Sequence, residues 1–341
     1  MKIGKVSENV LKRSILKQIK TKRKEVLNGA GVGEDCAILA FEKENFAAAT
    51  QALVIENGRG VRHGVMRAIN SLAAGGAEPV GITVAFLLPE TIEESEIKVL
   101  MQETDSICSE LNIQILGGHT EVTKAVSKPV ITVTGVGKLM AEGAVCSAGR
   151  LMTEVSPCSV GKKPAAGLDI VVTKWVGLEG TAILAKEKEQ ELRTKYPSHL
   201  VEEAKGFEKY LPILPEAATA VKSGVYKMHD ASEGGIFGAL WELAECLGVG
   251  LEIDLKKLPI RQETIEVCEY FDLNPYELLS GGSLLLATEK GFDLVRALEK
   301  EHISAAVVGK TTENNDRVVI NEEERRFLEP RKTDEIHKVK F

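Results

Sequence analysis

Apolar segments of strand length alternate with amphipathic segments of helix length through most of the chain. Residues 46–55 form an apolar run typical of a buried strand, and residues 63–74 follow with apolar side chains at helical spacing. The second half repeats this order, with a strand expected at 169–173 and a helix at 178–188. Because a sheet must bury its apolar faces against other elements, the alternation predicts an α/β (α+β) fold with helices packed on one or both faces of a sheet.

The remaining elements divide the chain into two halves. We expect further strands at 79–88, 113–116, 129–136, 225–228, 283–287, 305–308 and 317–320, and further helices at 89–111, 206–222, 234–247 and 292–301. A stretch with little periodicity separates the halves, and a length of 341 residues favours two domains, so we expect domains at 1–160 and 161–341. The charged segment after Phe327 is expected to be loosely held.

Composition limits the partners and the compartment. The formal net charge of −7 and the lack of a basic stripe with interleaved aromatics argue against nucleic-acid binding. The sequence has no signal peptide pattern and no apolar run of about 18 residues, so we expect no membrane association and a cytoplasmic location. The 6 cysteines are scattered without a Cys-x-x-Cys pair, which favours buried reduced thiols over zinc or iron–sulfur ligation.

Basic residues cluster near the N-terminus, between Lys12 and Lys24. Their ordinary interpretation is a solvated helix face. The alternative is a flexible basic segment that closes over a polyphosphate.

Three turns combine glycines with carboxylates, each beside an apolar run. They lie at residues 29–35, 115–122 and 228–235. The third runs into the amphipathic helix expected at 234–247, whose first turn Asp230 or Ser232 could cap. A helix start beside a Gly-Gly pair is a ready anion site, because unpaired N–H groups point outward there. Together the turns predict a metal–phosphate site assembled from distant segments.

The carboxylates of these turns are suitable ligands for Mg²⁺, which prefers hard oxygen donors together with water and substrate phosphates. They are Glu34, Asp35, Glu121, Asp230 and Glu233. The alternative for each is a turn residue that bonds its own backbone or is simply exposed. Their concentration beside glycine pairs favours a shared site.

Three other polar residues have two interpretations each. His119 could act as a base or bind a phosphate oxygen, or it could satisfy a turn. Asn70 could reach a nucleotide or form a hydrogen bond within the helix layer, and Lys174 could neutralise phosphate charge or be exposed. Neither a Walker pattern nor a Gly-x-Gly-x-x-Gly motif that opens a helix is present, so the P-loop and Rossmann interpretations fail.

Five segments in this order resemble the aminoimidazole-ribonucleotide (AIR) synthetase superfamily: 31–37, 68–79, 117–121, 228–235 and 280–285. The superfamily includes a hydrogenase maturation factor that dehydrates a carbamoyl thioester, thiamine-monophosphate kinase, selenophosphate synthetase and formylglycinamidine ribonucleotide synthetase. The chain is most similar to the hydrogenase-maturation branch. The resemblance implies a homodimer in which the N-terminal domains pair to form a β-barrel, and a C-terminal α/β sandwich-like domain.

The resemblance also implies ATP and Mg²⁺ as cofactors. An amide or carboxylate oxygen of a small substrate would attack the γ-phosphate, and the protein would mainly position groups and neutralise charge. The expected site, from the turns and the resemblance together, has Asp35, Glu34 and Asp230 on the metal, Asp35, His119 and Asp230 in catalysis, and Gly33, Asn70, Gly117, Gly118, Thr120, Lys174, Glu233 and Gly234 around the nucleotide.

The sequence departs from the superfamily pattern at two positions that usually hold metal-binding aspartates. Gln51 and Ser71 stand there, and neutral side chains bind Mg²⁺ more weakly than carboxylates. The last cysteine is Cys268, so we do not expect the carbamoyl-carrier chemistry of a C-terminal cysteine. Two functions therefore stay open: an ATP-dependent enzyme, with AIR synthesis itself as one of its candidate reactions, or a nucleotide-binding regulatory or assembly protein without turnover.

Overall fold

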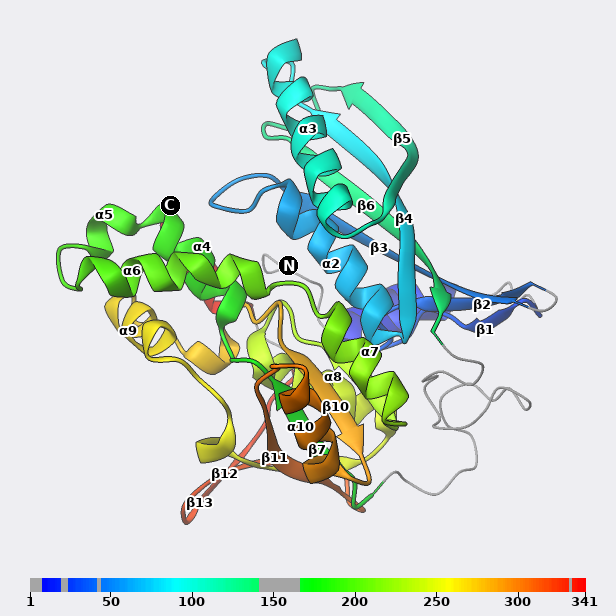
Figure 1. Ribbon diagram of the computed structural model, residues 1–341, viewed down its shortest axis with the longest axis vertical. Helices are drawn as coiled ribbons and strands as arrows, with labels where there is room; N and C mark the ends of the chain where they lie inside the picture. The colour runs from blue at the N-terminus through cyan, green and yellow to red at the C-terminus, as the bar shows by residue number, and fades with distance from the viewer. Residues whose placement is uncertain (1–7, 20–23, 42–43, 141–165, 331–332) are drawn as a thin grey trace.

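The computed structural model describes residues 8–19, 24–41, 44–140, 166–330 and 333–341. The chain forms two sheets, one in each half, with helices packed against both (Figure 1). This mixed α/β arrangement in two parts agrees with the expected fold class. The boundary expected at residue 160 lies outside the described residues.

The first sheet has six strands in the order β1-β2-β3-β6-β4-β5. Neighbouring strands are antiparallel except β4 and β5, which are parallel. The strands are β1 (Val26–Asn28), β2 (Ala37–Phe41), β3 (Glu44–Val54), β4 (Ala77–Leu88), β5 (Gln114–Val122) and β6 (Val130–Leu139).

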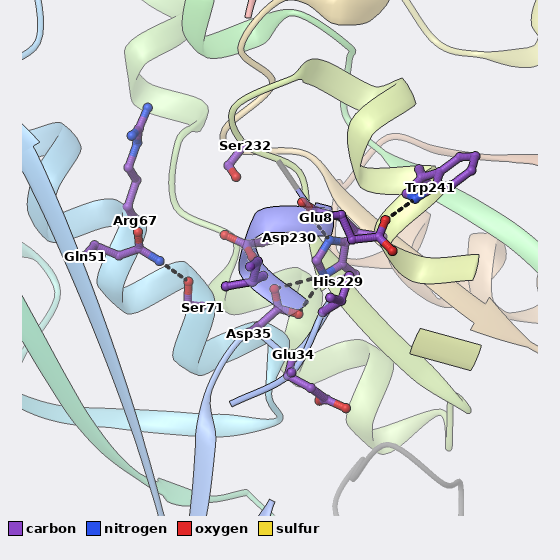
Figure 2. Close-up of a pocket in the computed structure, with 15 residues that line it drawn as sticks. Glu8, Glu34, Asp35, Gln51, Arg67, Ser71, His229, Asp230, Ser232 and Trp241 are labelled. Atoms are coloured by element: carbon purple, nitrogen blue, oxygen red, sulfur yellow. Dashed lines mark hydrogen bonds and ion pairs between the residues drawn. The ribbon is translucent and has the colours of Figure 1, made fainter. Parts of the chain in front are cut away.

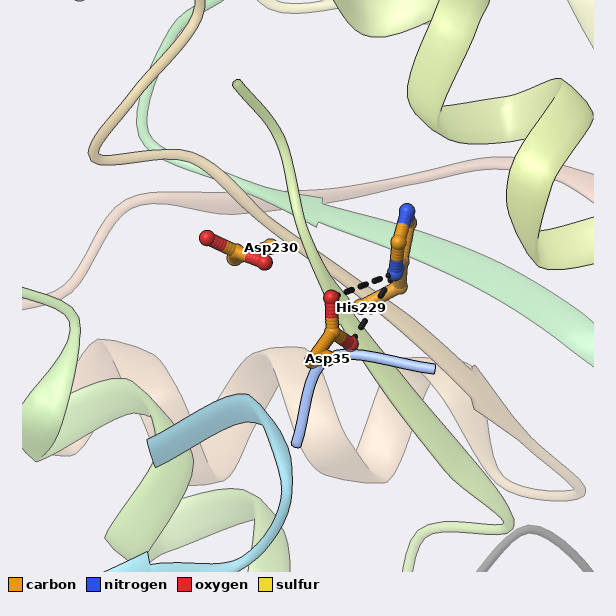
Figure 3. Close-up of side chains that lie close together, drawn as sticks. All are labelled: Asp35, His229 and Asp230. Atoms are coloured by element: carbon orange, nitrogen blue, oxygen red, sulfur yellow. Dashed lines mark hydrogen bonds and ion pairs between the residues drawn. The ribbon is translucent and has the colours of Figure 1, made fainter. Parts of the chain in front are cut away.

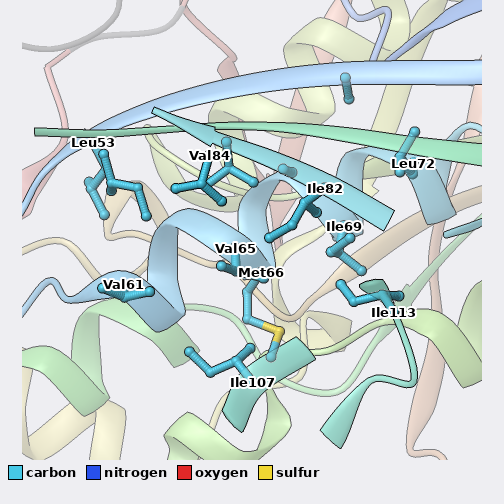
Figure 4. Packing of buried hydrophobic residues seen from close by; sticks show 14 of the residues in the cluster. Leu53, Val61, Val65, Met66, Ile69, Leu72, Ile82, Val84, Ile107 and Ile113 are labelled. Carbon is cyan, nitrogen blue, oxygen red and sulfur yellow. The ribbon is translucent and has the colours of Figure 1, made fainter. Parts of the chain in front are cut away.

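Two helices, α2 (Val61–Ala74) and α3 (Glu94–Glu110), lie on one face of this sheet (Figure 1). The apolar residues of α2 recur at helical spacing and are buried in the domain core, as Val65, Ile69 and Leu72 illustrate. They belong to the same cluster as Ile82 and other strand residues (Figure 4). Burial of one helix face against one sheet face therefore accounts for this half of the fold.

On the opposite face of the first sheet, which we call the open face, the side chains are exposed or half-buried among the described residues. Side chains alternate between the two faces of a strand, and along β4 buried and more exposed residues alternate over much of its length. Val80 on β4 and Val54 on β3 are 51% and 39% exposed. Among the described residues the sheet does not close into a barrel, so the barrel expected across a dimer stays a prediction.

The second sheet has seven strands in the order β13-β12-β9-β11-β7-β10-β8. The strands are β7 (Asp169–Thr173), β8 (Lys227–Asp230), β9 (Gly250–Asp254), β10 (Leu284–Thr288), β11 (Ala305–Thr312), β12 (Arg317–Asn321) and β13 (Glu324–Phe327). Helix α8 (Gly235–Leu247) packs on one face, and α7 (Leu214–Lys222) and α10 (Gly291–Lys300) pack on the other. Every residue of β10 is buried, which is expected of a strand covered on both faces.

Four further helices pack beside this sheet: α4 (Leu178–Glu187), α5 (Glu189–Leu192), α6 (Ser198–Lys205) and α9 (Gln262–Tyr270). The C-terminal segment packs against them, and Ile336 is 1% exposed. The expectation of a loosely held tail after Phe327 is therefore wrong, because Ile336 is buried in the core and the Asp334 carboxylate accepts backbone N–H groups.

Short helical turns occupy several connections. They are α1 (Glu8–Val10), η1 (Leu11–Ile15), η2 (Leu16–Gln18), η3 (Gly206–Tyr210), η4 (Leu255–Lys257), η5 (Pro275–Glu277) and η6 (Glu335–Lys338). The single helix expected at 206–222 is instead η3 followed by α7, with Pro212 between them. In the described part of the chain, no helix combines the length and the apolar character needed to cross a membrane.

Candidate functional site

A cavity of about 270 Å³ lies where the two halves of the chain meet (Figure 2). Its lining comes from the glycine-rich turn before β2, from α2 and β3, from the end of β8 and the start of the following loop, from α8, and from the N-terminal segment. The lining residues are Glu8, Leu11, Gly31, Val32, Gly33, Glu34, Asp35, Gln51, Arg67, Ser71, His229, Asp230, Ser232, Trp241 and Glu242. Two of the three predicted glycine–carboxylate turns therefore do meet at one cavity.

Asp35, His229 and Asp230 form the centre of this site (Figure 3). Each offers one ligand atom, and these atoms lie within 4.8 Å of one another. The Nδ1 atom of His229 is 2.9 Å from both Asp35 carboxylate oxygens, and its Nε2 atom is 3.1 Å from Glu242 Oε2. His229 received no role from the sequence, although its place beside Asp230 at a strand end was a usable signal.

Burial and charge oppose each other in this cluster. Burial disfavours the ionised form of Asp35, but the charges and hydrogen bonds of its neighbours, His229 first, outweigh burial and lower its pKa. Burial also disfavours the charged form of His229, yet Asp35 and Glu242 raise its pKa to about 10. Without a bound cation, the cluster therefore holds an imidazolium between carboxylates.

The two neutral residues that replace metal-binding aspartates lie at the same cavity. The Gln51 side chain donates a hydrogen bond from Nε2 to Ser71 Oγ over 3.2 Å. Gln51 comes from β3 and Ser71 from α2, and both line the cavity with Asp35. They add neutral oxygen donors to the site but no negative charge.

Glu34 makes a buried ion pair beside the cluster. Its Oε2 atom is 3.1 Å from Lys227 Nζ, with side-chain exposures of 7% and 8%. Asn28 donates to the same oxygen over 2.8 Å, and the Cys246 thiol donates to Oε1 over 3.4 Å. Figure 2 shows the Glu34 carboxylate directed away from Asp35 and Asp230. The side chain expected on a metal therefore balances a buried lysine in this structure.

Arg67 lines the cavity although no sequence motif pointed to it. It lies on α2, where its Nη2 atom is 3.3 Å from Glu179 and its Nη1 atom is 3.7 Å from Glu233. Arg59 lies 3.9 Å from the same Glu233 carboxylate. Residues four apart share a helix face, so the spacing of Arg67 and Ser71 is a sequence signal that both side chains face the same site. These ion pairs join the two halves of the chain.

The start of helix α8 is not capped as expected. Gly234 is its N-cap residue, with φ of 85°, and no side-chain capping bond forms there. Its N–H instead donates to Asp334 Oδ2 over 2.6 Å, so the amide expected to bind a phosphate bonds to a carboxylate from the C-terminal segment. The predicted caps, Asp230 and Ser232, line the cavity instead. The αL conformation at Gly234 explains why this position needs a glycine.

Asn70 and Lys174 do not line the cavity. The Asn70 amide donates to Leu211 O over 2.8 Å and accepts from Ile213 N–H over 3.2 Å. Lys174 is buried, donates to Tyr210 O over 2.7 Å and pairs with Glu216 over 2.6 Å. Both residues therefore hold the connection before α7. Asn70 forms structural hydrogen bonds, as its second interpretation expected. Lys174 neither lines the cavity to neutralise phosphate nor is exposed.

The segment expected to form the second glycine turn is a strand. Gly117, Gly118, His119 and Thr120 all lie on β5, an edge strand of the first sheet that pairs in parallel with β4. The turn expectation at 115–122 is wrong because backbone pairing with β4, including a bulge near Gly117, continues the strand through both glycines. The His119 side chain is 66% exposed and lies 3.3 Å from Glu121. Within one chain, β5 contributes no residue to the cavity lining.

The N-terminal segment forms part of the cavity wall. Trp241 on α8 donates from Nε1 to Glu8 Oε2 over 2.7 Å, and Lys12 pairs with Glu8 over 2.6 Å and with Glu245. Lys12, from the basic cluster, is thus bound to the protein surface. The basic positions 20, 22 and 23 lie outside the described residues.

The cysteines fit the expectation of buried reduced thiols where they are described. Cys36, Cys108, Cys246 and Cys268 are free and buried. The cysteines at 146 and 158 lie outside the described residues.

Comparisons with known proteins identify the family. Residues 33–139 match the N-terminal domain of AIR synthase related protein, and residues 165–321 match its C-terminal domain. The chain belongs to the AIR synthase related protein family. A putative hydrogenase expression/formation protein of Methanocaldococcus jannaschii is 25% identical to this chain. The aligned region spans 93% of this chain and 91% of that protein. Carbamoyl dehydratase HypE of Rhodobacter capsulatus is 27% identical to this chain over a region that spans 76% of this chain and 70% of that protein.

Several solved structures share the fold. A HypE–HypF complex contains a chain with a TM-score of 0.69 and 18% identity, covering 88% of this chain and 94% of that one. The structure of a hydrogenase maturation protein HypE in complex with ATP matches with a TM-score of 0.66 and 17% identity. The match covers 98% of this chain and 97% of that chain. Identity at this level establishes the fold alone, so the ligands of those proteins become proposals for this chain.

Proposed function

We propose that this protein is an ATP-binding enzyme that activates an amide or carboxylate oxygen of a small substrate by phosphoryl transfer. The observation that carries the proposal is the convergence of Asp35 and Asp230, one from each family domain, at a single cavity. A fold-level relative binds ATP, which supports ATP as the nucleotide. Phosphoryl transfer requires positioning and charge neutralisation more than covalent help from the protein, and paired carboxylates at a cavity provide a place for the cation.

The donor set fits a divalent cation, which we propose to be Mg²⁺ on the grounds of family resemblance. Asp35 and Asp230 would hold it, with Gln51 and Ser71 as neutral oxygen donors nearby. A bound cation of this kind neutralises the charge that develops on a transferred phosphoryl group. Gly33, with φ of 70°, keeps the turn before Asp35 close to α8: a Cβ there would lie 2.4 Å from Glu242 O. This glycine therefore sets the position of Asp35.

We propose that the active form is a homodimer joined through the open face of the first sheet. Exposed apolar residues on β3 and β4, including Val54 and Val80, are the kind of surface that a second copy covers. Closure of the two sheets into the barrel that the resemblance implies would also give the exposed edge strand β5 a partner. His119 and Thr120 would then complete the cavity of the second copy, which reconciles their expected role with their distance from the cavity in one chain.

Subunit complementation tests this shared-site arrangement. Asp35→Asn and His119→Ala chains should each be inactive alone. When they are mixed, unfolded and refolded together, heterodimers with one intact site should restore about a quarter of wild-type activity. No recovery from a mixture shown to contain heterodimers would contradict the shared site.

The alternative is a nucleotide-binding regulatory or assembly protein without turnover. The specific observation in its favour is that Gln51 and Ser71 leave the metal site with fewer carboxylates than its relatives are expected to have. The HypE–HypF complex shows that a protein of this fold can assemble with a partner. The buried free cysteines support a reducing compartment, and we propose the cytoplasm for either function.

An ADP-release assay separates the two functions. Purified protein is incubated with ATP, Mg²⁺ and a panel of small amides and carboxylates, and ADP is measured with and without each compound. The enzyme proposal predicts ADP release that depends on at least one compound and disappears in Asp35→Asn. ATP binding without ADP release across the panel would favour the non-catalytic alternative.

A further inference from the structure

The central cluster differs from an all-oxygen magnesium site because an imidazole stands in it. Asp35 and Asp230 supply carboxylate oxygens, and His229 supplies a ring nitrogen within 4.8 Å of both (Figure 3). Mg²⁺ demands oxygen ligands in octahedral geometry, whereas imidazole suits zinc and other first-row transition metals. The donor set therefore favours a different ion from the one that the fold suggests.

The surroundings of His229 have the arrangement of a metal-binding histidine. Such a residue binds the metal with one ring nitrogen and donates the other N–H to a carboxylate, which fixes the orientation of the ring. Here Nδ1 faces Asp35, and Nε2 lies 3.1 Å from Glu242 Oε2 on α8. His229 itself is 3% exposed, so the ring is held by the protein interior. Glu242 is thus a positioning residue, independent of the two aspartates.

The neighbouring positions strengthen the case against Mg²⁺ as the preferred ion. Gln51 and Ser71 line the cavity and bond to each other, so they add no charge to the two carboxylates. Glu34 is paired with Lys227. A hard cation that dehydrates reluctantly therefore finds few charged ligands, while a metal with affinity for nitrogen gains one from His229.

We propose that Asp35, Asp230 and Nδ1 of His229 bind a divalent transition-metal ion, Mn²⁺ or Zn²⁺, in preference to Mg²⁺, and that the Nδ1 proton is released to solvent as the ion binds. The ion binds to the protein without nucleotide. Only its further role, as the bridge to the ATP phosphates, rests on the proposed function.

Pulsed electron paramagnetic resonance of the Mn²⁺ complex, prepared without nucleotide, tests the ligand assignment. Coupling of the Mn²⁺ electron spin to a ¹⁴N nucleus reports a directly bound imidazole. The signal should be present in wild type, absent in His229→Gln, and retained in His199→Gln, which changes an exposed histidine on α6. A wild-type Mn²⁺ complex without ¹⁴N coupling would overturn the proposal without any variant.

Calorimetric titrations with MnCl₂, ZnCl₂ and MgCl₂ test the preference. In His229→Gln the affinity for Mn²⁺ and Zn²⁺ should fall by about 100-fold, while the affinity for Mg²⁺ should change by less than about threefold. Equal losses for all three ions would overturn the assignment. If His229→Gln does not fold, Glu242→Gln serves instead: it should weaken Zn²⁺ binding by roughly 10- to 100-fold and keep the ¹⁴N signal. Unchanged Zn²⁺ affinity in that variant would contradict the proposal.

Separate ATP titrations, one in EDTA and one with MgCl₂ or MnCl₂, keep this result distinct from the proposed function. ATP binding with no transition-metal site would refute the metal assignment alone. A metal site without ATP binding would refute the nucleotide proposal alone.

Discussion

Replacing Glu34 by glutamine should destabilise the protein without removing its metal site. The carboxylate faces Lys227 at 3.1 Å, and both side chains are less than a tenth exposed. Opposite charges near Lys227, Glu34 and Asp35 among them, raise its pKa against the effect of burial, so the lysine is charged beside Glu34 in the wild-type protein. Removing one member of such a buried pair costs about 3–5 kcal/mol, because the other charge remains without compensation. Glutamine keeps an oxygen for the Asn28 hydrogen bond, so we expect the lower end of this range.

Urea unfolding of four proteins measures this effect: wild type, Glu34→Gln, Lys227→Met and the double variant. The double variant leaves no unpaired charge and should be within about 1–2 kcal/mol of wild type, so the cycle should reveal a coupling of several kcal/mol. Metal affinity, measured where each protein is folded, should be similar in all four. A Glu34→Gln protein with wild-type stability and weakened metal binding would refute this reasoning and restore Glu34 as a ligand.

Three further predictions concern the cavity, the open sheet face and the C-terminal segment. The pair Gln51→Asp and Ser71→Asp should tighten Mg²⁺ binding by more than the sum of the single changes, and no gain on titration would defeat the idea of a weakened site. Light scattering at micromolar concentration should show a dimer for wild type and a monomer for Val80→Lys. The control Val99→Lys, on α3, should stay dimeric, and a monomeric wild type would exclude the dimer. Burial raises the pKa of Asp334 to about 6, so its stabilising contribution is complete below the unfolded value of 3.8 and is lost as the pH rises through 6. From about pH 4 to pH 8, wild type should lose about 2 kcal/mol of unfolding free energy relative to Asp334→Asn, and parallel pH profiles would contradict this.

The sequence predicted the elements whose pattern is local and strong. Helix α2 and strand β7 lie close to the residues expected, because their apolar side chains repeat at the period of the element that buries them. Strand β9 and helix α9 were not anticipated. The two glycines of the edge strand β5 suggest a turn, whereas its pairing with β4 is a long-range effect that the local pattern does not specify.

The candidate site was predictable in part for the same reason. The turns that contain Asp35 and Asp230 have local signals, and the structure brings them together. The partners of these residues come from distant segments. Lys227 forms the ion pair that directs Glu34 away from the cluster, and Asp334 accepts the hydrogen bond of the Gly234 amide at the start of α8. Asn70 looked available from its motif but bonds to the backbone near residue 211. Such contacts depend on the whole fold, which a single motif does not specify.

The most direct test of the account is calorimetric titration of ATP into wild type, Asp35→Asn and Asp105→Asn, each with and without a divalent cation. Asp105 is an exposed carboxylate on α3, so its variant controls for the loss of one negative charge. The cation should tighten ATP binding to wild type and to Asp105→Asn. In Asp35→Asn, shown to be folded by circular dichroism, the effect of the cation should disappear. Cation-dependent ATP binding that is unchanged in folded Asp35→Asn would contradict the placement of the metal and the nucleotide at this cavity.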